Sequence, residues 1–242
     1  MSQRQQYLSA LGLTDWRQRR PLQVQAPQAS APRVAAPEII VPAPQVVLRD
    51  RPAPGTDSWE AVAAEVAPCT RCELASCRTQ TVFGVGDRNA NWLIVGEAPG
   101  AEEDRQGEPF VGRAGQLLNS MLLGIGLKRE QAYIANVLKC RPPNNRDPKP
   151  EEVAQCLPYL DRQIALLKPR IMLAVGRIAA QNLLATDTPI GKLRGRRHAF
   201  GATQVPLVVT YHPAYLLRSP TEKRKAWEDL KFARGVAQER GA

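Results

Sequence analysis

Four of the five cysteines have a spacing that suits a metal centre. Cys69 and Cys72 form a C-x2-C pair, Cys140 follows after 67 intervening residues, and Cys156 follows after 15 more. A tetrahedral zinc ion and a [4Fe–4S] cluster both accept four thiolate ligands, so the spacing leaves the choice between them open. The alternative is that Cys140 and Cys156 are small buried apolar residues, a common role of free cysteine. We assign that ordinary role to the fifth cysteine, Cys77.

Polar and aromatic side chains gather near the ends of the predicted strands. Glu97 follows the first apolar run, Asn136 lies in the second, and His212 ends the fourth. In a parallel sheet the site lies beyond the carboxyl ends of the strands, so these residues should meet. With Phe110 from the loop of residues 96–118, the amide and the imidazole would form a pocket for a planar heterocycle. That loop lacks the G-x-x-x-x-G-K-[ST] pattern, which excludes an NTPase phosphate loop.

The elements that must position these residues alternate between strands and helices. Short apolar runs predict four strands, and a first helix should begin near residues 56–58. This alternation indicates an α/β fold, with a central four-stranded parallel sheet covered on both faces in three layers. The predicted strands are 92–96, 132–139, 170–176 and 206–212, and the later helices are 114–123, 150–167, 178–184 and 220–238.

Composition divides the chain into three parts. Residues 1–20 form a short amphipathic peptide, residues 21–55 a Pro/Ala-rich linker, and residues 56–242 the folded domain. The formal net charge of +10 over 242 residues favours a polyanionic partner, with nucleic acid first. The sequence has no run of about 18 apolar residues and no secretory signal, so we expect no membrane segment and a cytoplasmic location.

Three motifs together make the sequence recognisable. Residues 96–118 read GEAPGAEEDRQGEPFVGRAGQLL, residues 136–148 read NVLKCRPPNNRDP, and residues 210–218 read TYHPAYLLR. With the four cysteines at their spacing, residues from about 67 to 235 resemble the family-4, iron–sulfur uracil-DNA glycosylases. The resemblance implies the fold of that family and hydrolysis of the N-glycosidic bond of deoxyuridine in single- and double-stranded DNA. It also implies a [4Fe–4S] cluster held by Cys69, Cys72, Cys140 and Cys156.

The resemblance gives the pocket residues roles in excising a base, which must first be extruded from the duplex. Phe110 would stack on the pyrimidine ring, a contact worth about 1–3 kcal/mol. The Asn136 amide can match O4 and N3–H of uracil together, whereas cytosine presents the opposite pattern. His212 would donate to O2, where negative charge develops as the base leaves, which is typically worth about 3–4 kcal/mol.

The acidic residues of the loop are the candidates for lining the pocket and for stabilising charge beside the sugar. The best-known uracil glycosylases carry an acidic residue where this chain has Ala98, and there it positions the water. We therefore expect another group to position the water, or a largely dissociative reaction with negative charge beside the sugar cation. Glu97 is the candidate catalytic carboxylate and Asp104 a candidate pocket residue, while Glu103 would approach C5 and disfavour the thymine methyl. The alternative for each is a solvated surface carboxylate.

The C-terminal part of the chain is the predicted DNA-binding surface. Residues 190–242 contain eleven Lys or Arg and four Asp or Glu, a balance of 11 − 4 = +7. Clusters of this kind are needed for phosphate contacts. An apolar tip behind the histidine would enter the gap left by the flipped base. The candidate contacts are Arg194, Arg196, Arg197 and Arg218, with Leu216 or Leu217 as the wedge.

Residues 3–20 resemble the N-terminal peptide of the psi subunit of the bacterial polymerase III clamp loader. That match implies binding to the clamp loader, and the linker would then tether the enzyme near new DNA. Two other functions stay open, namely a glycosylase for another deaminated or damaged base and a non-enzymatic, replication-associated DNA-binding accessory. Nothing in the sequence suggests more than a monomer.

Overall fold

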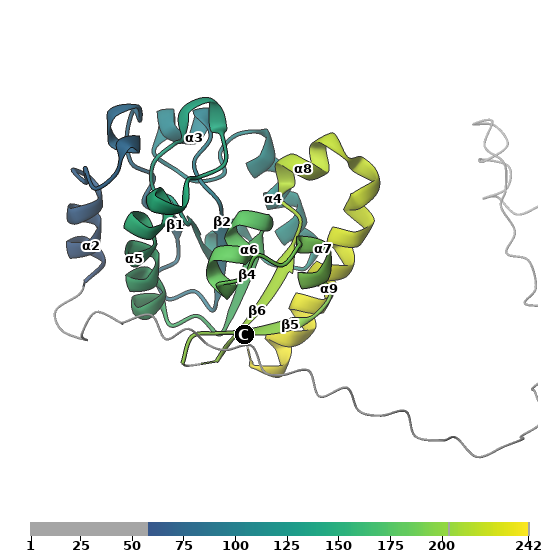
Figure 1. Ribbon diagram of the computed structural model, residues 1–242. Helices are drawn as coiled ribbons and strands as arrows, with labels where there is room; N and C mark the ends of the chain where they lie inside the picture. The colour runs from purple at the N-terminus through teal and green to yellow at the C-terminus, as the bar shows by residue number, and fades with distance from the viewer. Residues whose placement is uncertain (1–57, 203, 242) are drawn as a thin grey trace, which may run out of the picture. The chain divides into compact units, whose positions relative to one another are not determined.

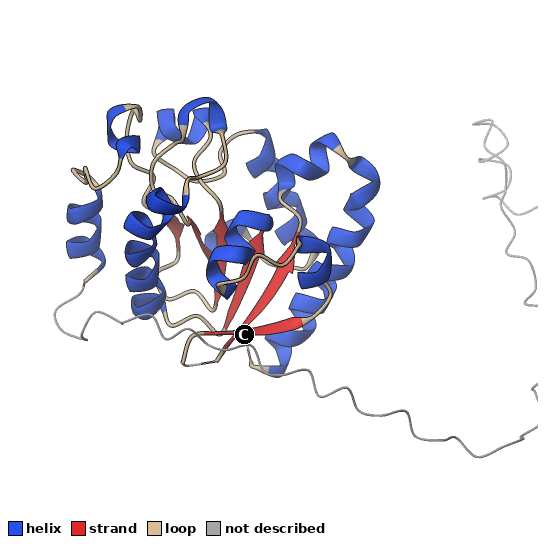
Figure 2. Cartoon of the chain, viewed as in Figure 1, coloured by secondary structure: helices blue, strands red, loops and turns tan. Residues whose placement is uncertain are grey.

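The computed structural model describes residues 58–202 and 204–241, which fold around one mixed sheet of six strands (Figure 2). The strand order is β1-β3-β2-β4-β6-β5. The four central strands run parallel, and each edge strand runs antiparallel to its neighbour. The strands are β1 (Val85–Gly86), β2 (Trp92–Gly96), β3 (Ala132–Asn136), β4 (Ile171–Val175), β5 (Arg197–Phe200) and β6 (Val205–Thr210).

The α/β fold predicted from the sequence is confirmed, but the sheet has two more strands than expected. The predicted four-stranded parallel sheet is the centre of the observed one. β1 is only two residues long, and β5 alternates between exposed and half-buried positions. Neither edge strand therefore has the buried apolar run that predicts the central strands.

Helices cover both faces of the sheet, which makes three layers (Figure 1). Successive strand residues point to opposite faces. In β2, Leu93 and Val95 enter one core, while Trp92 and Ile94 enter the other. Packed into the first core are α2 (Trp59–Val66), α5 (Pro150–Leu167), α6 (Arg177–Leu184) and α7 (Ile190–Leu193). Packed into the second are α4 (Arg113–Gly124), α8 (Pro213–Arg218) and α9 (Lys223–Glu239).

Helix boundaries follow the sequence signals where those signals exist. Ser58 caps α2 as its side chain accepts a hydrogen bond from the Ala61 N–H at 3.1 Å, and α5 has the predicted bounds. A short helix, α3 (Ala101–Gln106), interrupts the segment expected to be a loop. Asp104 is its only buried residue, so no apolar period marks it.

Short 3-10 helices complete the connections, at Glu73–Ser76, Arg129–Gln131, Pro143–Asn145 and Pro220–Glu222. The amphipathic peptide of residues 1–20 and the linker of residues 21–55 lie outside the described residues. Across the part of the chain that the structure describes, no helix is both long and apolar enough to cross a membrane.

Candidate active site

Three of the predicted pocket residues leave the sheet at the carboxyl ends of parallel strands. Asn136 is the last residue of β3 and pairs in register with Gly96, the last residue of β2. Glu97 follows Gly96 directly, and His212 lies two residues beyond the end of β6. The parallel centre of the sheet therefore brings together segments that are far apart in the chain.

Gly96 leaves the space in which two of the pocket side chains lie. A Cβ atom at this position would be 2.3 Å from Oδ1 of Asn136 and 2.6 Å from Cζ of Phe110, so any larger residue would displace them. The phenyl ring of Phe110 also lies beside the imidazole of His212, with ring centroids 5.7 Å apart and planes tilted by 31°. Amide, phenyl and imidazole groups therefore converge in one place.

The backbone around Phe110 is held by the loop that precedes it. Phe110 has a φ of 56°, a conformation that persists only when its surroundings enforce it. Oε1 of Glu103 accepts hydrogen bonds from the N–H groups of Val111 and Gly112, both at 3.0 Å. The guanidinium of Arg129 donates to the carbonyl of Phe110 at 3.3 Å. These contacts fix where the phenyl ring can lie.

Asn136 presents an unpaired acceptor in this place. Its side chain is 2% exposed, and Oδ1 accepts no hydrogen bond within the described structure. Leaving a buried polar atom without a partner costs about 1–3 kcal/mol. The atom is therefore a ready acceptor for a ligand that brings its own N–H or O–H donor.

His212 caps α8 with its ring and is held neutral. Nδ1 accepts a hydrogen bond from the N–H of Ala214 at 3.2 Å. The pKa of His212 is lowered to about 4, mainly by burial and to a smaller extent by the charge of Arg218, while Glu103 acts in the opposite direction. At neutral pH the single ring proton therefore lies on Nε2, since Nδ1 is used as an acceptor. The ring can donate a hydrogen bond without carrying a charge.

Glu97 is the acidic candidate whose pKa differs most from its ordinary value. The pKa of Glu97 is raised to about 7, mainly by burial and to a smaller extent by the charge of Asp147, while Arg177 acts in the opposite direction. Nη2 of Arg177 lies 2.6 Å from Oδ2 of Asp147, so the two form an ion pair near this carboxylate. A carboxylate with a pKa near neutral pH is suited to acid–base work or to stabilising positive charge.

The two other acidic candidates accept hydrogen bonds from backbone N–H groups, Glu103 within the loop and Asp104 from an earlier segment. Asp104 is 3% exposed, and both of its oxygens accept the N–H of Thr79, at 2.9 and 3.0 Å. Glu103 uses Oε1 on the backbone behind Phe110, as described above. Ala98 is half-buried and packs against the first core. Sequence patterns do not reveal these backbone partners, because only the folded loop brings them near.

The predicted DNA-binding arginines include one that is internal. Nε of Arg194 lies 2.6 Å from Oδ2 of the buried Asp229, and its guanidinium covers the ring of Tyr211 at 4.2 Å. These partners occupy Arg194, so its first role is to hold the basic turn against α9. The exposed candidates are Arg196, Arg197 and Arg218.

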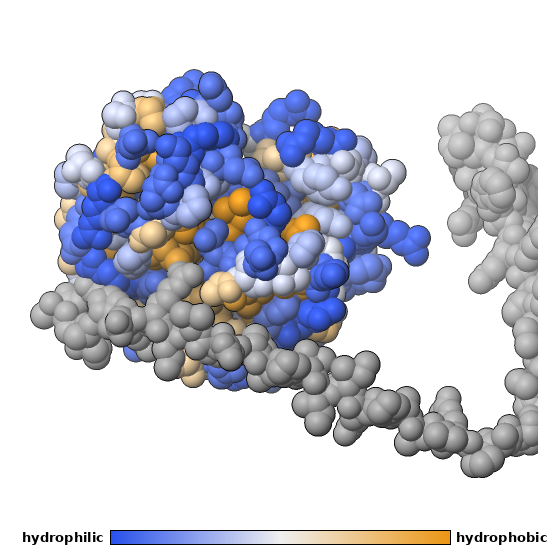
Figure 3. Space-filling model, in the orientation of Figure 1, coloured by the Kyte–Doolittle hydropathy of each residue, from blue (hydrophilic) through white to orange (hydrophobic). Residues whose placement is uncertain are grey.

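The two candidate wedge residues in α8 differ in exposure. Leu216 is 1% exposed and belongs to the second core, whereas Leu217 is 36% exposed. Leu217 is therefore the one of the two that a partner can reach. The face of the molecule in Figure 3 is mostly hydrophilic, with hydrophobic residues in small separate areas.

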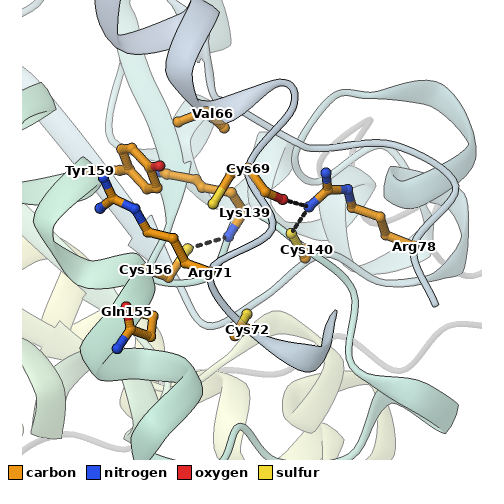
Figure 4. Close-up of a pocket in the computed structure, with 10 residues that line it drawn as sticks. All are labelled: Val66, Cys69, Arg71, Cys72, Arg78, Lys139, Cys140, Gln155, Cys156 and Tyr159. Atoms are coloured by element: carbon orange, nitrogen blue, oxygen red, sulfur yellow. Dashed lines mark hydrogen bonds between the residues drawn. The ribbon is translucent and has the colours of Figure 1, made fainter. Parts of the chain in front are cut away.

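Four cysteines line a single pocket (Figure 4). Cys69 and Cys72 come from the segment after α2, Cys140 follows β3, and Cys156 lies in α5. Cys77 is exposed and does not belong to this lining. The pocket therefore joins the N-terminal part of the described chain to the sheet and to its longest helix.

Basic side chains share the cysteine pocket, and their scattered positions give no pattern in the sequence. Arg71, Arg78 and Lys139 line it. Nη1 of Arg78 donates to Sγ of Cys140 at 3.1 Å, and the backbone N–H of Lys139 donates to Sγ of Cys156 at 3.2 Å. Burial raises the pKa of both thiols, to about 11 for Cys156.

The donor set of this pocket fits a metal centre held by thiolates. Within residues 58–202 and 204–241, no three His, Cys, Asp or Glu side chains are already grouped as a metal site. A four-thiolate centre would bring negative charge, and the basic lining would neutralise it. Donors to sulfur are also a usual feature of iron–sulfur sites. The residues present therefore suit a centre of this kind.

Comparison with known proteins identifies the family. Residues 83–231 match the model of the Uracil DNA glycosylase superfamily. The chain belongs to this superfamily. The Type-4 uracil-DNA glycosylase of Archaeoglobus fulgidus is 44% identical over 181 residues, which cover 72% of this chain and 91% of that protein. The Type-4 uracil-DNA glycosylase of Thermotoga maritima is 41% identical over 186 residues, which cover 75% and 96% respectively.

A uracil-DNA glycosylase of another type is also related. The Type-5 uracil-DNA glycosylase of Pyrobaculum aerophilum is 31% identical over 166 residues, which cover 62% of this chain and 73% of that protein. The two Type-4 relatives are thus more similar to this chain than the Type-5 one. The family membership predicted from the motifs is confirmed, and the superfamily match contains Phe110, Asn136 and His212.

Proposed function

We propose that the protein is a base-excision repair enzyme that hydrolyses the N-glycosidic bond of deoxyuridine in single- and double-stranded DNA. It releases uracil and leaves an abasic site. The observation that carries the proposal is the unpaired Oδ1 of Asn136 beside the phenyl ring of Phe110 and the neutral imidazole of His212. The Type-4 names of the relatives support it.

Uracil matches the groups of the site. Phe110 stacks on the extruded base, and Oδ1 of Asn136 accepts from N3–H while Nδ2 donates to O4. Cytosine has an acceptor at N3 and an amino group at C4, so both contacts would be mispaired. A buried polar site rejects such an analogue strongly, because its own groups lose their partners.

Bond cleavage places negative charge on the base and positive charge on the sugar. Nε2–H of His212 donates to O2, and this contact strengthens as the base becomes an anion. Because the imidazole is neutral at neutral pH, it stabilises this charge through the Nε2–H hydrogen bond and not through a net positive charge. Glu97, when ionised, supplies the negative charge that favours the sugar cation and holds the incoming water.

The test of the substrate assignment uses three single-stranded oligonucleotides that differ only in one base, which is uracil, cytosine or thymine. Chromatography of the released bases should show uracil from the first and none from the other two. Release of another base, with none from the uracil strand, would instead support a glycosylase for a different lesion.

The proposed role of Glu97 gives a pH prediction. The single-turnover rate should rise with pH through about 7, because the carboxylate is the active form and its pKa is raised to about 7. Glu97→Gln should lower the rate by about 10²-fold and flatten this rise, as expected for an acid–base group. Glu102→Gln, an exposed change in α3, is the matched control. A Glu97→Gln variant with the wild-type rate and profile would contradict the role.

The exposure of Leu217 gives a second prediction. Leu217→Ala should lower the rate on duplex DNA by about tenfold, since the wedge offsets the few kcal/mol of unstacking. The rate on single strands should change little, because no partner base has to be replaced. Leu123→Ala removes a leucine that is 65% exposed on α4 and should change neither rate. Equal losses on both substrates would exclude a wedge.

We further propose that Cys69, Cys72, Cys140 and Cys156 hold a [4Fe–4S] cluster, with Arg71 and Arg78 offsetting its charge. When bound, the cluster supplies a cross-link between the segment after α2, the end of β3 and α5. The chemistry of excision itself is assigned to the side chains of the candidate active site.

The expectations about location and assembly remain predictions. They are a cytoplasmic monomer that binds the clamp loader through residues 3–20, which lie outside the described residues. Loss of co-purification with clamp-loader subunits when Leu11 and Trp16 are replaced would support the contact. Co-purification that survives both replacements would contradict it.

A further inference from the structure

Lys139 is a buried lysine that lines the cysteine pocket (Figure 4) and follows Asn136 by three residues in the chain. Its side chain is 1% exposed. Nζ donates to the backbone oxygen of Asn136 at 2.9 Å and to Oε1 of Gln163 at 2.6 Å. Among the described residues no carboxylate forms an ion pair with this ammonium group. The ammonium group therefore hydrogen-bonds to the end of β3 and to one residue of α5.

The contacts of Lys139 continue in two directions. Gln163 donates from Nε2 to the backbone oxygen of Phe83 at 3.0 Å and to the hydroxyl of Tyr133 at 3.2 Å, so it is fixed in the core. The backbone N–H of Lys139 donates to Sγ of Cys156, which lies two turns before Gln163 in α5. One side chain thus connects the anchored helix to the strand end that carries the Asn136 amide.

A lysine is an unfavourable choice for this position if stability alone matters. A buried ammonium group loses its hydration, and an apolar side chain of similar volume often replaces such a group with equal or higher stability. The hydrogen bonds of the ammonium group indicate a role in the candidate active site instead. It holds the main-chain carbonyl of Asn136, whose amide oxygen is unpaired and lies in the space left by Gly96 beside Phe110.

We infer that Lys139 is a positioning residue for the Asn136 amide. By tying the carbonyl of Asn136 to Gln163, it restricts rotation of the strand end and so fixes the direction of Oδ1 and Nδ2. Through Gln163, the Lys139 side chain also connects Asn136, which would recognise the base, to α5, the helix that carries Cys156. The inference rests on the proposed excision of uracil, and it assigns to Lys139 no contact with the substrate.

The test compares the full-length protein, as purified with its metal, with Lys139→Met. The variant should lose between about 10- and 100-fold in kcat, as when a supporting contact of a functional group is removed. Inhibition by free uracil should weaken in parallel, because the amide no longer points correctly. Affinity for DNA with a reduced abasic site, metal content and melting temperature should match the wild type. Lys168→Met, at an exposed position after α5, is the matched control.

Each outcome decides the inference. If Lys139→Met keeps the wild-type kcat and the wild-type inhibition by uracil, the inference is wrong while the proposed function stands. If the wild type itself releases no uracil, both are wrong. If Lys139→Met loses metal or has a lower melting temperature, the test uses Gln163→Leu instead. This change removes one acceptor of the Lys139 ammonium group but leaves the residue next to Cys140 unchanged. A lower kcat at full metal content then supports the inference, and a wild-type kcat overturns it.

Discussion

Replacing His212 with alanine should lower kcat for uracil excision by about 10²- to 10³-fold, because it removes the donor to O2 where charge develops. The loss should be nearly the same at any pH well above 4, since the pKa of His212 is lowered to about 4 and the ring is neutral throughout. Single-turnover excision from a labelled oligonucleotide measures it. DNA binding should change much less than the rate.

The other histidine is the control for this experiment. His198 lies in the edge strand β5, and its Nε2 contacts the carbonyl of Leu193 at 2.7 Å. His198→Ala should therefore leave the excision rate per folded molecule unchanged. A His212→Ala variant that excises uracil as fast as His198→Ala would contradict the assignment of the donor, even though the family would still be correct.

Replacing Cys140 with alanine should remove the metal and most of the folded state. Structural metal centres contribute about 10–16 kcal/mol in zinc peptides, which is comparable with the roughly 5–15 kcal/mol total stability of a domain. We expect Cys140→Ala to lack bound iron and to be largely insoluble. Iron and acid-labile sulfide per chain, with the melting temperature, measure the effect.

Cys77 provides the matched control for the metal site. Its side chain is exposed and lies outside the pocket formed by the other four cysteines. Cys77→Ala should keep the iron, the sulfide and the melting temperature of the wild type. Equal loss of iron in the two variants would contradict the ligand set. If the wild-type protein contains zinc and neither iron nor sulfide, the four cysteines hold a zinc ion and not a [4Fe–4S] cluster.

The sequence predicts the centre of the fold because burial on both faces leaves a readable pattern. β2, β4 and β6 are apolar runs, and the rule for parallel sheets points to Asn136 and His212 at strand ends. The edge strands and α3 were not predicted, since they are short and largely exposed or half-buried. Their existence depends on pairing with the rest of the sheet or on the folded loop.

Charged residues are the part of the site that sequence reasoning places least well. Arg194 lies in a basic turn typical of phosphate contacts, yet it pairs with Asp229 from α9. Asp104 and Lys139 are likewise buried, and they find their partners, Thr79 and Gln163, on segments that are distant in the chain. A local pattern shows that a charge exists, but only the folded chain shows whether it faces solvent, ligand or another residue.

The most direct test of the account is excision of uracil from a labelled oligonucleotide in EDTA, followed by alkali, on single-stranded and duplex DNA. We predict strand cleavage at the uracil only after alkali on both substrates, which is the result for a glycosylase that needs no divalent metal and leaves an abasic site. Strands that remain intact after alkali, with protein that carries its full metal content, would contradict uracil excision as the function.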